Sequence, residues 1–266
     1  MKVLGQLRKM DVEAQSPIAY FLSLDKKSYP LNQHIGESIS LKWAGTITCI
    51  ECGRKTRKSY DQGYCFPCSR DLPGNAMCSV RPELCEHEKG NEADQEFWRT
   101  HCKIDHFVYL SLTSGVKVGI TSHYNIPDRW IDQGAVKGLI IAKVPERVLS
   151  GQIEVAIAKD FADKTNWRKM LKGEVAEVDL LTFRDKAQEL FPTELKKYAV
   201  KDGQVEELVY PIESVPEKIS SHNLDKTPEF TDRLTGIKGQ YLIFERRVIN
   251  MRKYGGYHVE FDFQDR

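Results

Sequence analysis

The sequence lacks any long hydrophobic run. Its longest apolar stretches, such as Gly138 to Val144, have the length of a β-strand. A membrane-spanning helix needs about 20 apolar residues. The first eight residues also lack the apolar segment of a secretory signal peptide. We therefore expect a cytoplasmic protein that has no membrane partner.

An excess of charge of one sign is also lacking. The 39 Lys and Arg residues nearly balance the 38 Asp and Glu residues, which leaves a net charge of +1. This balance excludes a protein that attracts nucleic acid through its overall charge. The distribution is uneven, however, because six basic and two acidic side chains lie between Leu41 and Arg70, a local net charge of +4.

Cysteine is absent from the last 164 residues, and all seven cysteines lie between Cys49 and Cys102. Without a secretory signal we expect reduced thiols, which serve as metal ligands or as small buried apolar residues rather than as disulfides. Clustering within one part of the chain favours metal binding.

Four of the cysteines form two pairs with the spacing of a metal site. Cys49 and Cys52 make one C-x2-C pair, Cys65 and Cys68 make the other, and twelve residues separate them. Each pair closes a tight turn. Gly53, directly after the first pair, supplies the positive φ that such a turn often needs. We predict a zinc ribbon with one structural Zn²⁺, or rarely iron, at about 2.3 Å from each sulfur. Four cysteines fill the coordination sphere, so this metal is not catalytic.

The segment between the two pairs combines positive charge with an aromatic ring. Its candidate nucleic-acid-binding residues are Arg54, Lys55, Arg57, Lys58 and Tyr60. Cations interleaved with aromatic rings can contact phosphates and stack on bases. A solvated hairpin tip has the same composition, so both interpretations stay open.

The other three cysteines form a second, less regular group. Together with one histidine they give the spacing C-x6-C-x-H-x14-C, made by Cys78, Cys85, His87 and Cys102. Three thiols and one imidazole can hold a second Zn²⁺ or ligate an iron–sulfur cluster. The alternative is a set of buried cysteines beside a surface histidine. We expect a second metal, because this part of the sequence has few other residues for a core.

Hydrophobic periodicity predicts an α+β fold. The middle of the chain gives the order ββαβα, at residues 107–112, 116–121, 126–133, 137–144 and 145–163. Further strands are predicted at 18–24, 38–48, 240–244, 248–252 and 257–263, and a helix at 184–198. The domains that we expect are a β-rich N-terminal segment (1–48), a region held by metal (49–104) with the zinc ribbon at 49–70, an α/β core (105–171), and a C-terminal helix and β-rich segment (172–266) that can pair with 1–48.

The α/β core resembles the GIY-YIG endonuclease family over about 60 residues. The resemblance is carried by Phe107-Val-Tyr109, by Lys117-Val-Gly-Ile-Thr121, by Arg129 on the next helix and by Glu154 on the helix after the third strand. Taken singly, Tyr109 could be a sheet aromatic, Arg129 a surface cation beside an indole and Glu154 a solvated carboxylate. Their occurrence together, on the expected elements and in the expected order, favours the GIY-YIG-like interpretation.

The resemblance implies phosphodiester hydrolysis that depends on a divalent metal. Tyr109 would help to activate water, Arg129 would neutralise charge on the phosphoryl oxygens, and Glu154 would hold Mg²⁺ or Mn²⁺. Lys117 stands where the family has its second tyrosine. That lysine could hold the scissile phosphate, with Tyr124 or His123 supplying the missing group.

The whole chain is similar to an uncharacterised bacterial family, domain-of-unknown-function family 2797 (DUF2797). This similarity implies no biochemical role. The residues behind this similarity are the four ribbon cysteines, Arg81-Pro-Glu-Leu-Cys85, Lys117-Val-Gly-Ile-Thr121, Arg129-Trp-Ile-Asp-Gln-Gly-Ala135 and Gly236-Ile-Lys-Gly-Gln-Tyr-Leu242. We predict a zinc-binding protein that acts on DNA or RNA, with hydrolysis at the GIY-YIG-like site. The alternatives are a non-catalytic nucleic-acid-binding or regulatory protein and a protein–protein adaptor.

Overall fold

The computed structural model describes residues 1–161 and 166–264. The chain forms two compact units, one made of Met1–Asp71 and Val209–Arg266 and the other of Leu72–Leu208. The four ribbon cysteines therefore lie in the first unit, and the other three lie in the second. Among the described residues, no helix has both the length and the apolar character that crossing a bilayer requires.

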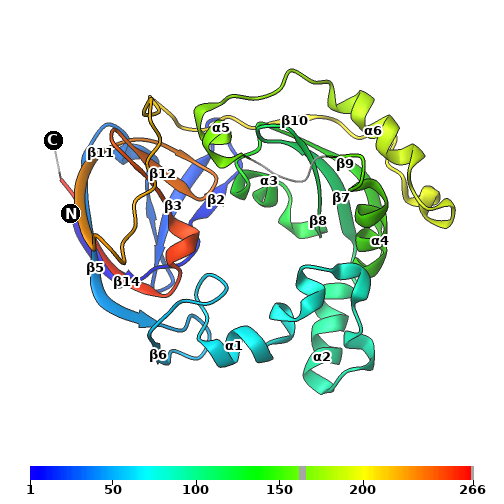
Figure 1. The fold of residues 1–266 in the computed structure, drawn as a ribbon, viewed down its shortest axis with the longest axis horizontal. Helices are drawn as coiled ribbons and strands as arrows, with labels where there is room; N and C mark the ends of the chain where they lie inside the picture. Colours follow the sequence, from blue (N-terminus) through cyan, green and yellow to red (C-terminus); the bar gives the residue numbers. More distant parts are fainter. Residues whose placement is uncertain (162–165, 265–266) are drawn as a thin grey trace. The chain divides into compact units, whose positions relative to one another are not determined.

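The first unit consists mainly of antiparallel strands in two sheets (Figure 1). Seven strands form one sheet in the order β1-β14-β5-β11-β12-β13, with β6 paired to β5, and β2-β3-β4 form the other. The strands are β1 (Lys2–Gln6), β2 (Asp11–Glu13), β3 (Ala19–Leu24), β4 (Lys27–Pro30), β5 (Ser38–Thr48), β6 (Lys55–Thr56), β11 (Glu229–Lys238), β12 (Tyr241–Phe244), β13 (Val248–Asn250) and β14 (Tyr257–Phe263). The helices are η1 (Asn32–His34), α1 (Phe66–Asp71) and η9 (Met251–Tyr254).

Strands from the two ends of the sequence share the larger sheet. β14 pairs with β1 on one side and with β5 on the other, and β5 also pairs with β11. Alternate residues of β14 are buried, namely Tyr257, Val259, Phe261 and Phe263. One face of a strand carries every second side chain, so this alternation places one face of β14 in the core of the unit.

The second unit surrounds a four-stranded antiparallel sheet in the order β10-β9-β7-β8. Its strands are β7 (His106–Leu112), β8 (Val116–Ser122), β9 (Lys137–Val144) and β10 (Glu206–Glu207). Its helices are η2 (Pro73–Asn75), η3 (Met77–Ser79), η4 (Pro82–Leu84), η5 (His87–Lys89), α2 (Glu92–Phe97), η6 (Trp98–Cys102), η7 (His123–Asn125), α3 (Asp128–Asp132), α4 (Arg147–Ile157), α5 (Trp167–Lys172), α6 (Leu180–Glu189) and η8 (Thr193–Tyr198). The elements β7, β8, α3, β9 and α4 follow the predicted order ββαβα. The predicted end of the last helix, at 163, lies outside the described residues.

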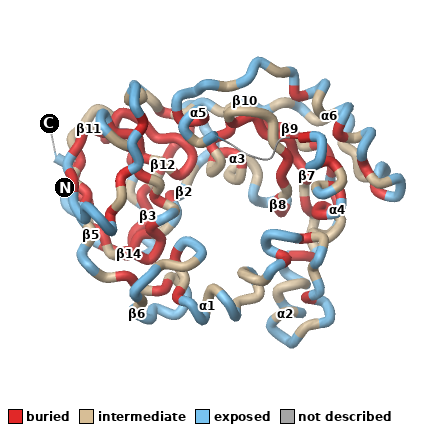
Figure 2. Tube along the Cα trace, viewed as in Figure 1, coloured by how far each residue is buried: buried red, intermediate tan, exposed pale blue. Residues whose placement is uncertain are grey.

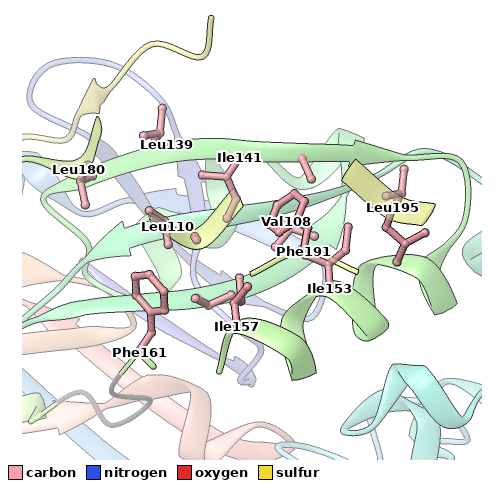
Figure 3. Packing of buried hydrophobic residues seen from close by; sticks show 14 of the residues in the cluster. Val108, Leu110, Leu139, Ile141, Ile153, Ile157, Phe161, Leu180, Phe191 and Leu195 are labelled. Carbon is pink, nitrogen blue, oxygen red and sulfur yellow. The ribbon is translucent and has the colours of Figure 1, made fainter. Parts of the chain in front are cut away.

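The two faces of β7 bury different side chains. Val108 and Leu110 pack in one hydrophobic cluster with Ile153 and Ile157 of α4 (Figure 3). Tyr109 points to the opposite face, as the period of two along a strand requires. Its ring lies 5.9 Å from that of Trp130 in an edge-on arrangement. Figure 2 shows the resulting concentration of buried residues along β7, β9 and α4.

The helix predicted at 184–198 is wrong, because the structure has two helices there. α6 ends at Glu189 and η8 begins at Thr193, with Pro192 between them. Proline has no amide hydrogen to donate, and it disfavours the α conformation of the residue before it. Pro192 therefore ends the first helix before the second begins.

Gly138 on β9 gives a test of the packing around Trp130. A Cβ atom on Gly138 would overlap the indole ring of Trp130, which is fully buried. We expect Gly138→Ala to lower the free energy of unfolding by about 2 kcal/mol, because the buried ring must move. Chemical denaturation measures this change. Gly115→Ala is the matched control, since a Cβ there would meet no described atom within 4 Å, and equal stabilities of the two variants would contradict the prediction.

Candidate functional site

The four ribbon cysteines converge on one point in the first unit. Cys49 directly follows β5, and Cys65 directly precedes α1, which contains Cys68. The four sulfur atoms lie within 4.8 Å of one another. The Sγ atoms of Cys52 and Cys65 are 3.7 Å apart, close to the edge of about 3.8 Å that follows from a tetrahedron with zinc–sulfur bonds of about 2.3 Å. The cluster can therefore bind a metal ion such as zinc.

Backbone amides favour the thiolate form of Cys49. Burial alone would raise the pKa of this thiol, but the amide groups of Cys52, Cys65 and Glu51 donate to its sulfur and bring the pKa to about 6. Gly53 has a φ of 70°, and its amide donates to the carbonyl of Cys49 at 3.0 Å. The positive φ predicted for Gly53 is thus confirmed, and the turn directs donors toward the sulfur that a metal would bind.

The predicted nucleic-acid-binding residues lie on the loop that joins the two cysteine pairs. Within this loop β6 pairs with the end of β5. Arg54, Lys55, Arg57 and Lys58 are all exposed. The Nζ atom of Lys58 lies 5.1 Å from the ring centroid of Tyr60. The loop therefore presents four cations to solvent beside the half-buried ring of Tyr60.

Three of the four predicted ligands of the second metal site lie together in the second unit. The donor atoms of Cys78, Cys85 and His87 are within 4.8 Å of one another. Cys102 is not in that group, but its thiol is buried and hydrogen-bonds with that of Cys85. Burial raises the pKa of Cys102 to about 12 and that of Cys78 to about 11.

Tyr109 and Arg129, both predicted to be catalytic, meet between β7 and α3. The Tyr109 hydroxyl accepts a hydrogen bond from Nε2 of Gln133 at 3.0 Å and another from the Arg129 side chain. The tyrosine is fully buried and passes over Gly119 of β8, where a Cβ would come within 2.5 Å of the hydroxyl. Burial raises the pKa of Tyr109 despite these two donors. The hydroxyl therefore stays protonated and holds Arg129 in place.

The other two predicted catalytic residues, Glu154 and Lys117, lie on α4 and β8. Glu154 is on α4, and its charge raises the pKa of Tyr109. With Val118 of β8 and Glu83 it lines a cavity of about 380 Å³. Lys117 is half-buried on β8. The four residues therefore do not share one cavity, because Arg129 and Glu154 line different ones.

A second cavity of about 320 Å³ in the same unit is lined by Arg129 together with three other basic residues. Its lining comprises Gly74, Ser79, Phe97, His101, His106, Ile120, Thr121, Ser122, Tyr124, Asn125, Arg129 and Arg147. We call it the basic cavity. Among the described residues that line it, none is aspartate or glutamate. The basic cavity thus combines two guanidinium groups with two imidazoles and several hydroxyl and amide groups.

His106 is the only buried histidine among the described residues of this lining. Burial lowers its pKa, and the charge of Arg147 lowers it further, whereas a hydrogen bond to the carbonyl of Ile104 raises it. Nδ1 lies 2.8 Å from that carbonyl oxygen, so Nδ1 donates and Nε2 carries the lone pair. Both the burial of His106 and the nearby charge of Arg147 thus favour the neutral form of this imidazole.

Sequence reasoning missed Arg147, His106 and His101, which share the basic cavity with Arg129. Arg147 begins α4, and its Nη2 donates to the carbonyl of Ser79 at 3.2 Å. The polar run from Ser122 to Asn125, directly after a strand, was the one local signal of this site, because binding residues concentrate in loops at the ends of rigid elements.

Comparison with known proteins gives one match. The family model for proteins of unknown function DUF2797 matches residues 36–259. No curated protein and no solved structure matches the chain. The matched region includes the four-cysteine cluster, the second cysteine group and the basic cavity. Because it covers most of the 266 residues, the chain belongs to the DUF2797 family of proteins of unknown function.

Proposed function

We propose that this protein binds nucleic acid through its phosphodiester backbone, at the basic cavity. The observation that supports this proposal is the presence of Arg129 and Arg147 in one cavity, where no described lining residue is acidic. A guanidinium group presents a planar fork of donors that fits two phosphate oxygens. Two such groups without a carboxylate beside them in the lining attract an anion.

Aromatic rings on the same lining favour a nucleic acid over a small anion. Phe97 and His101 stack with ring centroids 4.4 Å apart and nearly parallel planes. Tyr124 is 57% exposed, which is unusual for so large a ring. Exposed rings of this kind stack on bases, and base stacking contributes about 1–3 kcal/mol for each base. Phosphate contacts at the arginines and stacking at these rings would together hold a flexible single strand.

We also propose that the bound phosphodiester is hydrolysed, as the GIY-YIG resemblance implies. Arg129 would neutralise charge on the phosphoryl oxygens, and the enclosed Tyr109 would position Arg129 rather than touch water. Glu154 and Glu83 line one cavity, and one or two carboxylates are the usual protein ligands of Mg²⁺. These two residues would hold Mg²⁺ or Mn²⁺, which stabilises negative charge on a phosphoryl group. They line a different cavity from Arg129, so the proposed hydrolysis requires a substrate that reaches both cavities.

Fluorescence anisotropy with labelled single-stranded and hairpin DNA and RNA tests the binding proposal. We expect Arg129→Ala and Arg147→Ala each to weaken binding about 10-fold, because each removes charged hydrogen bonds to phosphate. We also expect a smaller salt dependence, since fewer counterions are released. Arg168→Ala is the matched control, because Arg168 is exposed on α5 and does not line the basic cavity. Thermal denaturation checks that each variant folds.

The alternatives give different results in the same assay. One alternative result is binding that survives both cavity variants but fails after joint substitution of Arg54, Lys55, Arg57 and Lys58. That result would place recognition on the loop that joins the two cysteine pairs. Absence of binding to every probe would favour the protein–protein adaptor. Incubation of the protein and the same probes with Mg²⁺ or Mn²⁺ tests hydrolysis. We expect Glu154→Gln to abolish cleavage and to retain binding. A wild-type protein that binds the probes without cleaving them would contradict the hydrolytic proposal and leave the binding proposal intact.

A further inference from the structure

The second cysteine group has the internal distances of a tetrahedral metal site. Nδ1 of His87 lies 3.6 Å from Sγ of Cys78 and 3.7 Å from Sγ of Cys85. Around one zinc ion, bonds of about 2.3 Å to sulfur and about 2.0 Å to nitrogen separate the two donor atoms by about 3.5 Å. The three donors are thus spaced as ligands of a single ion. An iron atom of an iron–sulfur cluster carries at most two protein ligands, so a third ligand lies on another iron atom and farther away.

The other ring nitrogen of His87, Nε2, lies 3.8 Å from Sγ of Cys78 and has a carboxylate at a similar distance. Nε2 lies 3.9 Å from Oδ1 of Asp94. A histidine that binds metal through one nitrogen commonly directs the other to a carboxylate, which fixes the orientation of the ring. Asp94 is itself held, because it and Asn91 form a reciprocal capping box at the start of α2. Gly90 leaves the space for it, since a Cβ there would come within 2.5 Å of the Asp94 Cβ.

Cys102 is the candidate for the fourth ligand, although its sulfur does not belong to the group of donor atoms that all lie within 4.8 Å of one another. It is only 2% exposed, and its thiol hydrogen-bonds with that of Cys85. It is the last residue of the π-helical turn η6. A π-turn is uncommon and occurs frequently at functional sites. Here the turn ends at Cys102, whose thiol interacts with that of Cys85.

The segment that carries these residues has almost no other core. All of residues 72–105 are described, and the buried ones are Cys78, Pro82, His87 and Cys102. Several apolar side chains of the segment are instead exposed, among them Met77 at 68% and Val80 at 78%. A segment with so little apolar burial needs another source of stability, such as a bound metal.

We propose that Cys78, Cys85, His87 and Cys102 bind a second structural Zn²⁺, with Asp94 as the carboxylate partner of His87. This ion would hold the segment from η2 to η6 against the rest of the unit. Within that segment η4 packs closely on α4: a Cβ added to Gly151 of α4 would come within 2.6 Å of the amide nitrogen of Glu83 in η4. The same segment supplies Phe97 and His101 to the basic cavity. The second zinc therefore holds one wall of that cavity, although the zinc site itself does not depend on nucleic-acid binding.

Metal analysis of the full chain tests this proposal independently of the proposed function. We expect two zinc ions per wild-type chain and one in the Cys78→Ser/Cys85→Ser variant. Cobalt substitution of the wild type should give the absorption bands of tetrahedral thiolate ligation at both sites. Hydrogen exchange should show faster exchange across residues 72–102 in the double variant and no change in the first unit.

Two milder variants keep the test decisive if the double variant does not fold. We expect Asp94→Asn to release the second zinc to a chelator about 10- to 100-fold more readily, because the partner of a ligating histidine is lost. Glu92→Gln is the matched control, on an exposed residue of the same helix turn. We also expect Cys102→Ser to weaken the second zinc. A single zinc per wild-type chain, iron with inorganic sulfide in its place, or unchanged zinc affinity in Asp94→Asn and Cys102→Ser would each overturn the proposal.

Discussion

We expect the four-cysteine cluster to bind zinc, and we expect a Cys65→Ser variant to lose this ion and to unfold from about residue 50 to residue 71. Residues 50–71 are all described, and Cys65 is the one side chain among them that is buried. The segment therefore has no apolar core of its own, and we expect its fold to depend on a bound metal. Structural zinc contributes on the order of 10 kcal/mol to the folding of isolated zinc fingers, so loss of one ligand has a large local effect.

Three measurements follow the loss of this zinc. Elemental analysis should show one zinc ion fewer per chain, and limited proteolysis should cut the segment between β5 and α1. Circular dichroism should change little, because the paired strands β5, β11 and β14 lie outside the segment. Ser69→Ala is the control, since it removes only a local hydrogen bond to the Phe66 carbonyl beside the cluster. A Cys65→Ser protein that keeps its zinc and resists protease would contradict the prediction.

The geometry of this cluster could be predicted because it is local. Two residues separate the members of each cysteine pair, and a single hairpin brings the pairs together, so the spacing alone determines that four sulfurs meet. The order of β7, β8, α3, β9 and α4 could be predicted for a similar reason. Hydrophobic periodicity changes from two to 3.6 residues within this stretch, and short polar turns separate its elements.

The basic cavity could not be predicted, because its residues come from distant parts of the sequence. Gly74 and Ser79 precede the sheet, Arg129 lies on α3, and Arg147 lies at the start of α4. No spacing rule connects these positions. The resemblance identified Arg129 and Glu154, but only the packing of η4 on α4 and of Tyr109 on Gly119 decides which cavity each of them lines.

Strand β11 shows a different limit of sequence reasoning. It is a ten-residue strand that pairs with β5 and β12, yet no strand was predicted at Glu229–Lys238. Its segment carries Asp232 and Lys238 at positions that are buried in the structure. Buried charges disrupt the alternation by which a half-buried strand is recognised. Asp232 is held by Arg246 and Arg247, at 3.3 and 3.1 Å, contacts that the sequence does not reveal.

Lys238 leads to a prediction about the pH dependence of stability. Its side chain is 3% exposed at the end of β11, and its Nζ lies 5.1 Å from the ring centroid of Tyr210. Burial lowers the pKa of Lys238 from 10.5 to about 8, because the charged form loses its hydration. The folded chain thus binds this proton less tightly than the unfolded chain. The cost is fully present below pH 8 and disappears as the pH rises from about 8 to 10.5.

Lys238→Met is therefore expected to raise the free energy of unfolding at pH 7 by about 2–3 kcal/mol, since one pKa unit corresponds to about 1.4 kcal/mol and methionine fills a similar apolar space. The gain should shrink steadily above pH 8 and be small by pH 10.5, where the lysine of the folded wild type is neutral and that of the unfolded chain is half deprotonated. Urea denaturation of both proteins at pH 7, 9 and 10 measures this convergence. Lys226→Met, at an exposed position of the same unit, should leave stability within about 0.5 kcal/mol at each pH. A gain from Lys238→Met that is the same at every pH would show that packing, and not the buried charge, limits the stability of this unit.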